Sequence, residues 1–160
     1  MTGAGRGGSA QLTFSEVNGN FRAYRVGEHQ HVPEMEEVLT GLLGNKTQVI
    51  FTPHLLPVNR GILATLYFRP VEPCTTGELI ALYENFYRET PFVRILPEGV
   101  YPAIKDVLYT NFCDIGIKVD QERQVVIVIA VIDNLVKGAA GQAIQNMNLV
   151  LGLGETRGLL

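Results

Sequence analysis

The chain has 160 residues, a formal net charge of −3 and a composition that is 46% hydrophobic and 18% charged. That length suits a single domain with one core, so residues 1–160 are expected to form one. No apolar run approaches the roughly 18 residues that a membrane helix needs. No basic cluster marks a nucleic-acid surface. The first residues lack the apolar stretch of a signal peptide, and the sequence therefore predicts a cytoplasmic protein that binds neither membranes nor nucleic acid.

The amino-terminal part predicts short extended segments, a helix and two strands. A turn is expected at Asn18 and Gly19. Pro33 predicts the first turn of a helix, where its missing N–H would have no partner, and Gly44 is placed to end that helix in the left-handed conformation. The apolar face of this helix comprises Met35, Val38, Leu39, Leu42 and Leu43. Residues 47–54 and 61–70 are rich in branched and aromatic side chains and predict two strands.

The carboxyl-terminal part predicts a helix, a short strand, a hairpin and a last helix. Thr75 or Thr76 can cap the first of these helices, with Glu78 in its first turn. Its apolar stripe comprises Leu79, Leu82, Tyr83, Phe86 and Tyr87. A short strand is expected at 91–96, and strands at 111–120 and 124–133 flank a short loop. The last helix is expected over 137–151, and the small residues at 138–141 would let another backbone approach closely.

These elements predict an α+β fold, in which helices lie on one face of a mixed, largely antiparallel sheet. The run VVIVIAVI at 125–132 is apolar at every position. Such a strand is typically buried on both faces. Because the chain offers few helices, a second subunit is expected to cover the other face of the sheet.

Two histidines, His29 and His31, stand one residue apart in VGEHQHVPEMEE. On an extended segment they would point the same way and could share a zinc ion, with Glu34 or His54 as further ligands. A zinc site needs three or four protein ligands, and nothing in the sequence fixes that geometry, so no metal is predicted. Two other interpretations stay open. The histidines are either loop residues that bond to the helix start, or they include a general base.

The two cysteines, Cys74 and Cys113, match neither a disulfide framework nor a metal knuckle. Cys74 lies at a strand-to-helix turn and Cys113 within an apolar strand. Each position is more typical of an inert structural thiol than of a nucleophile. The residues alone thus supply a candidate base without an obvious nucleophile.

Four stretches together resemble one enzyme family: GAGR, HQHVPEMEE, FTPHLLPVNRGILATLYF and DNLVKGAAGQAIQNMNLVLGL. In this order they resemble the carboxyl-terminal half of N-acetyl-γ-glutamyl-phosphate reductase. That enzyme of arginine biosynthesis reduces an acyl phosphate to an aldehyde with NADPH. The resemblance covers nearly the whole chain. It implies a fold similar to the C-terminal domain of glyceraldehyde-3-phosphate dehydrogenase-like enzymes.

The family begins with a Rossmann domain that carries a GxxGxxG loop and, further on, a nucleophilic cysteine in an NPGCY-type motif. Neither motif occurs in this sequence. The resemblance therefore implies that NADP is bound mainly by a domain that is not part of this chain. It also implies that the chain alone is catalytically inactive.

The family chemistry requires an acid–base group beside the thiol. The resemblance assigns this role to His29, with His31 as the second choice that supports it or binds substrate. Asn134 matches an asparagine that approaches the nicotinamide amide, and residues 134–160 would pack back on the Rossmann domain. The alternative is that Asp133 or Asn134 only caps the last helix.

Further carried-over positions concern the ligands. Gly3 and Gly5 match a loop near the cofactor, where absent side chains permit close approach. His54 and Arg60 are expected to bind the carboxylate or phosphate of the substrate, because arginine offers a planar fork of donors. Alternatively, Arg60 only orders the strand junction.

The implied function is the substrate-binding and dimerisation part of the NADPH-dependent reductase, with a small acyl phosphate as substrate. A homodimer or homotetramer formed through the sheet face is expected. Two alternatives stay open: the paralogous reductase of the α-aminoadipate lysine route, and an interaction module that keeps the fold without the chemistry.

Overall fold

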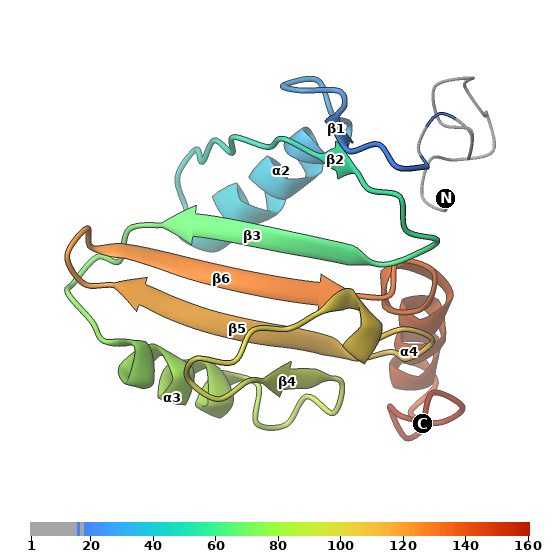
Figure 1. Cartoon of the computed structure of the whole chain (residues 1–160). Helices are drawn as coiled ribbons and strands as arrows, with labels where there is room; N and C mark the ends of the chain where they lie inside the picture. Colours follow the sequence, from blue (N-terminus) through green and yellow to red (C-terminus); the bar gives the residue numbers. More distant parts are fainter. Residues whose placement is uncertain (1–15, 17) are drawn as a thin grey trace. The chain divides into compact units, whose positions relative to one another are not determined.

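The computed structural model describes residue 16 and residues 18–160, which fall into two compact units. The first unit holds the described residues up to Val58, and the second comprises Asn59–Leu160. Each unit has its own helices and strands (Figure 1). The expectation of a single domain over residues 1–160 stays a prediction.

The first unit is built around helix α2 (His31–Leu43). Pro33 lies in the first turn, and Gly44 ends the helix with a left-handed φ of 70°, both as the sequence predicts. A two-residue strand, β1 (Arg22–Ala23), pairs antiparallel with β2 (His54–Leu55).

The strand predicted over residues 47–54 is wrong for most of its length. Residues 46–53 have no regular secondary structure, and only His54 belongs to β2. Branched side chains favour a strand only where a partner strand completes the ladder. Here side chains of α2 take that place: the N–H of Val49 donates to Glu36 Oε1 at 3.0 Å.

The second unit contains a four-stranded sheet. Its strands are β3 (Ile62–Phe68), β4 (Val93–Ile95), β5 (Cys113–Asp120) and β6 (Val125–Ile132), in the order β3-β6-β5-β4. All neighbours are antiparallel except β4 and β5. The predicted hairpin is formed by β5 and β6. The predicted α+β fold with a mixed, largely antiparallel sheet is confirmed.

Helix α3 (Thr76–Phe86) covers one face of this sheet (Figure 1). Thr75 Oγ1 accepts from the N–H of Glu78 at 3.2 Å, and the Glu78 carboxylate accepts from the N–H of Thr75 at 2.8 Å. This capping box starts the helix where the sequence predicts it. Beneath α3 lies a core of Ile115, Ile117, Val119, Val126 and Val128, packed against Leu79, Ile80, Tyr83 and Tyr87. Two members of the predicted stripe, Leu82 and Phe86, are exposed instead.

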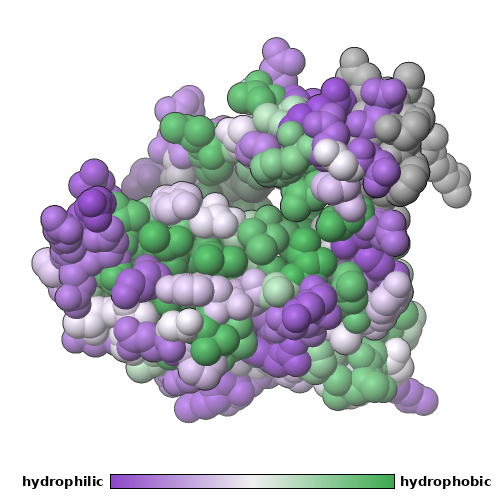
Figure 2. Space-filling model, in the orientation of Figure 1, coloured by the Kyte–Doolittle hydropathy of each residue, from purple (hydrophilic) through white to green (hydrophobic). Residues whose placement is uncertain are grey.

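The edge strand β3 is exposed along its whole length. Its pairing with β6 places Leu63 and Tyr67 on the face away from α3, beside Ile127 and Ile129. Figure 2 shows hydrophobic atoms gathered over β3 and β6. An apolar patch of this kind is typical of an interaction surface.

The last predicted helix forms in two parts, a π-helical turn η3 (Val136–Ala140) and helix α4 (Gly141–Val150), beyond the end of β6 (Figure 1). In α4 two polar side chains are buried and several apolar side chains are exposed, the reverse of a usual surface helix. The buried residues of α4 are Gly141, Gln145 and Asn148, whereas Ile144, Met147 and the C-cap residue Leu151 are exposed. Among the described residues, none of the helices is both long enough and apolar enough to cross a membrane.

A polar network fills the buried side of α4. Gln145 Oε1 accepts from Asn111 Nδ2 at 2.9 Å and from Lys137 Nζ at 2.8 Å, and Gln145 Nε2 donates to Glu155 Oε1 at 2.6 Å. Burial lowers the pKa of Lys137. Because these polar groups find partners inside the unit, the apolar face of α4 is left outward.

Candidate functional site

The histidine pair lies at the start of α2 in the first unit. His29 is 7% exposed, and its ring is surrounded by the rings of Tyr24, His31 and Phe51 at centroid distances of 5.5, 4.7 and 5.3 Å. Its Nδ1 accepts a hydrogen bond from the N–H of His31 at 3.2 Å, and its Nε2 lies 3.4 Å from the hydroxyl of Tyr24. The segment therefore folds around His29.

These contacts assign the protonation of His29. Because Nδ1 accepts, the neutral ring carries its proton on Nε2. Burial lowers the pKa of His29, and the nearby His31 and Arg25 lower it further, whereas Glu34 opposes the shift. The neutral imidazole is thus favoured. Among the described residues, the backbone amide of His31 lies at Nδ1 of His29 and the hydroxyl of Tyr24 lies at Nε2.

His31, by contrast, is exposed as the first residue of α2. His54 is also exposed, on β2, and its ring stacks on Phe21 at a centroid distance of 5.1 Å. The described residues contain no group of three or more His, Cys, Asp or Glu that is placed to hold a metal ion. Gly3 and Gly5 lie outside the described residues.

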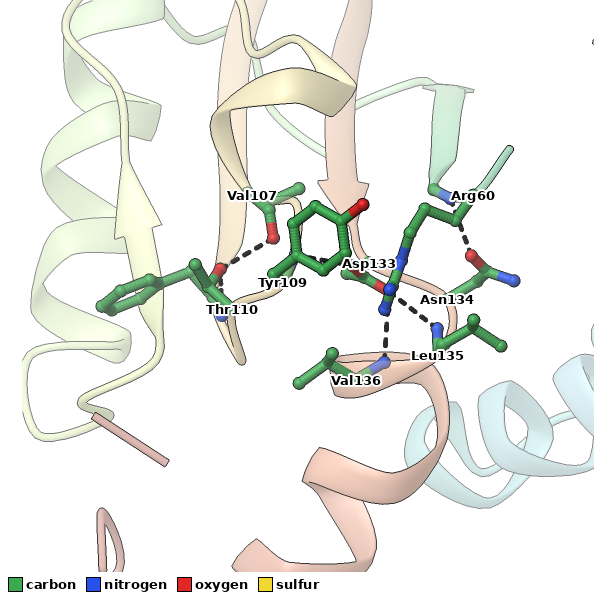
Figure 3. Close-up of polar contacts among 10 residues, drawn as sticks. Arg60, Val107, Tyr109, Thr110, Asp133, Asn134, Leu135 and Val136 are labelled. Carbon is green, nitrogen blue, oxygen red and sulfur yellow. Dashed lines mark hydrogen bonds and ion pairs between the residues drawn. The ribbon is translucent and has the colours of Figure 1, made fainter. Parts of the chain in front are cut away.

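A second cluster joins Arg60 to the end of β6 in the second unit (Figure 3). Arg60 Nη2 donates to Asp133 Oδ1 at 2.7 Å, and the guanidinium stands 4.4 Å from the ring centroid of Tyr109. The N–H of Gly61 donates to Asn134 Oδ1 at 2.7 Å. The fold thus brings together two of the residues that the resemblance singled out, Arg60 and Asn134.

Asp133 is the centre of this cluster and is fully buried. Its Oδ1 also accepts from the N–H groups of Leu135 and Val136 at 2.8 and 3.2 Å, and its Oδ2 accepts from the N–H of Tyr109 at 2.7 Å. Burial alone would raise the pKa of this carboxyl, but the donors outweigh burial and hold the pKa below its usual range. Asp133 therefore stays ionised and raises the pKa of Arg60 through their hydrogen bond.

Sequence reasoning missed Tyr109 and the wider role of Asp133. Capping by Asp133 is one of the sequence-based alternatives, and the bonds from Leu135 and Val136 match it. Nothing local marks Tyr109, whose backbone adopts an unusual φ of 63° and whose side chain is exposed.

Both cysteines are half-buried and not in a disulfide, and burial raises the pKa of Cys113, which disfavours a reactive thiolate.

The sequence profile described as semialdehyde dehydrogenase, dimerisation domain, matches residues 1–134. The chain belongs to this family. The matched residues include both histidines of the HQH motif, Arg60 and Asp133, and they end at Asn134. The match therefore spans the histidine pair and the second cluster as far as Asn134.

Relatives with a more specific name are also similar. The chain is 57% identical over 159 residues to the N-acetyl-gamma-glutamyl-phosphate reductase of Citrifermentans bemidjiense, and 55% identical over 161 residues to that of Symbiobacterium thermophilum. The alignments cover 99% and 100% of this chain but 46% of each relative. The chain therefore spans about half the length of the curated relatives that it matches.

Solved structures support the fold. A probable aspartate-semialdehyde dehydrogenase from Pseudomonas aeruginosa aligns with a TM-score of 0.67 at 23% identity, covering 84% of this chain and 42% of that one. Aspartate semialdehyde dehydrogenase II from Vibrio cholerae aligns with a TM-score of 0.62 at 17% identity, covering 76% and 36%. At these identities the likeness concerns the fold alone.

Proposed function

We propose that this chain is the substrate-binding and dimerisation part of an NADPH-dependent N-acetyl-γ-glutamyl-phosphate reductase that works in the cytoplasm. The observation that carries the proposal is the identity of 52–57% to reductases of that name over at least 99% of the chain. The full-length enzyme would reduce the acyl phosphate to N-acetylglutamate semialdehyde. When bound, NADPH supplies the hydride, and the nucleophilic thiol belongs to the other half of the protein.

Within this proposal the histidine pair supplies the acid–base group. The resemblance put His29 first, but the geometry supports a division of labour. His29 is buried, and both of its ring nitrogens have contacts. His31 is exposed at the start of α2, so its imidazole is the accessible one for a thiol on another domain. His31 then exchanges the proton, and His29 orients it through the backbone hydrogen bond.

Ligand contacts are proposed for five further positions. Arg60 and His54 would bind the anionic groups of the substrate, and the amide of Asn134 would face the nicotinamide. Arg60 retains 17% side-chain exposure beside Asp133, which is compatible with a ligand at its open edge. Gly3 and Gly5 would lie close to the cofactor, which is held mainly by the other half of the protein.

Residues 134–160 would pack back on that cofactor-binding domain. The exposed apolar side chains of α4 support this assignment, because its outward face carries Ile144 and Met147 and the exposed Leu151 follows at its end. Exposed apolar residues at this helical spacing are typical of a buried interface. The second apolar surface, on β3 and β6, would be buried by another copy of the chain in a homodimer or homotetramer.

The decisive experiment is an assay of the reverse reaction, in which N-acetylglutamate semialdehyde, phosphate and NADP⁺ yield NADPH. We expect turnover from the full-length protein that contains this chain and none from the chain alone. A folded full-length protein without turnover would contradict the function. Turnover with the semialdehyde of the α-aminoadipate route in place of this substrate would instead assign the lysine pathway.

A further inference from the structure

The second unit contains two ion pairs of similar construction, and they differ in one respect. Arg94 donates two hydrogen bonds to the Asp114 carboxylate, from Nε to Oδ1 at 2.6 Å and from Nη2 to Oδ2 at 2.7 Å. Its guanidinium lies 4.3 Å from the ring centroid of Phe112. Arg60 also stands over an aromatic ring and also meets a buried aspartate. It contacts Asp133 through Nη2 alone.

Within the described part of the chain, this single contact leaves one donor of Arg60 unpaired. Its Nε is buried and has no partner among the described residues. A buried ion pair that serves only stability gains most when both nitrogens of the fork are bonded, as in the pair of Arg94. The Nη2 atom of Arg60 is therefore fixed by Asp133, while part of the Arg60 side chain stays exposed beside Tyr109.

Asp133 also fixes the neighbouring segments. The Asp133 carboxylate accepts hydrogen bonds from the N–H groups at the start of η3 and from the N–H of Tyr109. The side chain of the adjacent Asn134 accepts a hydrogen bond from the N–H of Gly61. The dipeptide Asp133–Asn134 thus holds the dipeptide Arg60–Gly61 through two side chains. Displacing the Asp133 carboxylate would move Arg60 and Asn134 together.

We propose that Asp133 is a positioning residue that aims Arg60 at an anionic group of the substrate, a carboxylate or a phosphate, and keeps Asn134 in register with it. The proposal rests on the proposed function, which makes Arg60 and Asn134 the ligand-facing residues. Asp133 itself, fully buried, acts through them.

The test uses the full-length reductase with Asp133→Asn, Arg60→Ala and the double variant, in the reverse assay. Asp133→Asn should raise the KM for phosphate or for the semialdehyde by roughly ten- to hundredfold, the value of one charged hydrogen bond. Whichever KM rises identifies the anion that Arg60 meets. In the Arg60→Ala background the same change should have little further effect on that KM, because the partner through which Asp133 acts is gone.

Asp114→Asn is the matched control, since it breaks the other ion pair of the same unit. It should lower the melting temperature without changing either KM. Equal KM effects from the two aspartate variants, or independent effects of Asp133→Asn and Arg60→Ala, would overturn the proposal.

Two further measurements keep the test decisive. If Asp133→Asn does not fold, Arg60→Lys replaces it, because this variant retains the ion pair but loses the planar fork of donors. Arg60→Lys should then raise the KM that Arg60→Ala also raises. A KM like that of the native enzyme would refute the inference. Calorimetric titration with inorganic phosphate and, separately, with N-acetylglutamate as a carboxylate needs no turnover. If the native protein is inactive, the proposed function fails. Weaker binding of either anion by Asp133→Asn than by Asp114→Asn still supports positioning, and equal binding of both anions opposes it.

Discussion

The backbone N–H of His31 donates a hydrogen bond to Nδ1 of His29 over 3.2 Å, so one histidine of the HQH motif holds the other in place. The bond occupies the only lone pair of the neutral His29 ring, whose remaining nitrogen lies near the hydroxyl of Tyr24. The side chain of His31 is exposed. The two residues are therefore chemically unequal although the sequence presents them alike.

This inequality predicts a ranking of variants in the full-length enzyme. His31→Asn should lower kcat by roughly 10²–10⁴-fold, the usual loss for an acid–base group. His29→Asn should cost less, because it removes only the support of the His31 backbone. Steady-state kinetics of both variants check the ranking. A larger kcat loss for His29→Asn would restore His29 as the acid–base group.

The pKa of His29 also predicts a pH dependence of stability. Folding lowers this pKa below its ordinary value of 6.5, so the unfolded chain binds the proton more readily. The unfolding free energy should be highest above that value and decrease as the pH falls towards the folded pKa. Urea unfolding of this chain between about pH 8 and pH 5 measures the slope. His29→Asn should flatten it, and an unchanged slope would exclude His29 as the cause.

Gly141 predicts a steric effect at the junction of η3 and α4. A Cβ atom there would overlap Asn111 Oδ1 and would lie 2.7 Å from Val136 Cγ1 and 2.8 Å from its carbonyl oxygen. Gly141→Ala should reduce the unfolding free energy by about 1–3 kcal/mol. Gly138→Ala is the control, since its nearest contact would be an ordinary 3.4 Å to Ile132. Chemical denaturation of both variants tests this, and equal stabilities would show that the added methyl group is accommodated at both positions.

The apolar face of β3 and β6 predicts self-association. Tyr67 is 68% exposed on the face away from α3. If a second copy buries it, Tyr67→Glu should shift the chain towards monomer, because a charge would be desolvated in the interface. Leu82→Glu provides the control, as Leu82 is exposed on α3. Light scattering at micromolar concentration measures both, and a monomeric parent chain would argue against the interface.

Features set by neighbouring residues were predictable from the sequence. The capping box of Thr75 and Glu78, the left-handed Gly44 and the β5–β6 hairpin all follow from interactions within a few residues. The strand predicted over 47–54 was wrong because its partners are side chains of α2, such as Glu36, and not another strand. The π-helical start of the last helix carried no sequence signal either.

The sequence by itself determined the candidate residues: the HQH pair, Arg60 and the Asp133–Asn134 dipeptide are all visible in it. Only the tertiary structure decided what each can do. It buries His29 under Tyr24 and Phe51 while it leaves His31 exposed, and it joins Arg60 to a carboxylate 73 residues away. Helix caps and turns depend on local geometry, whereas burial and ion pairing depend on which distant segments the packed chain brings together.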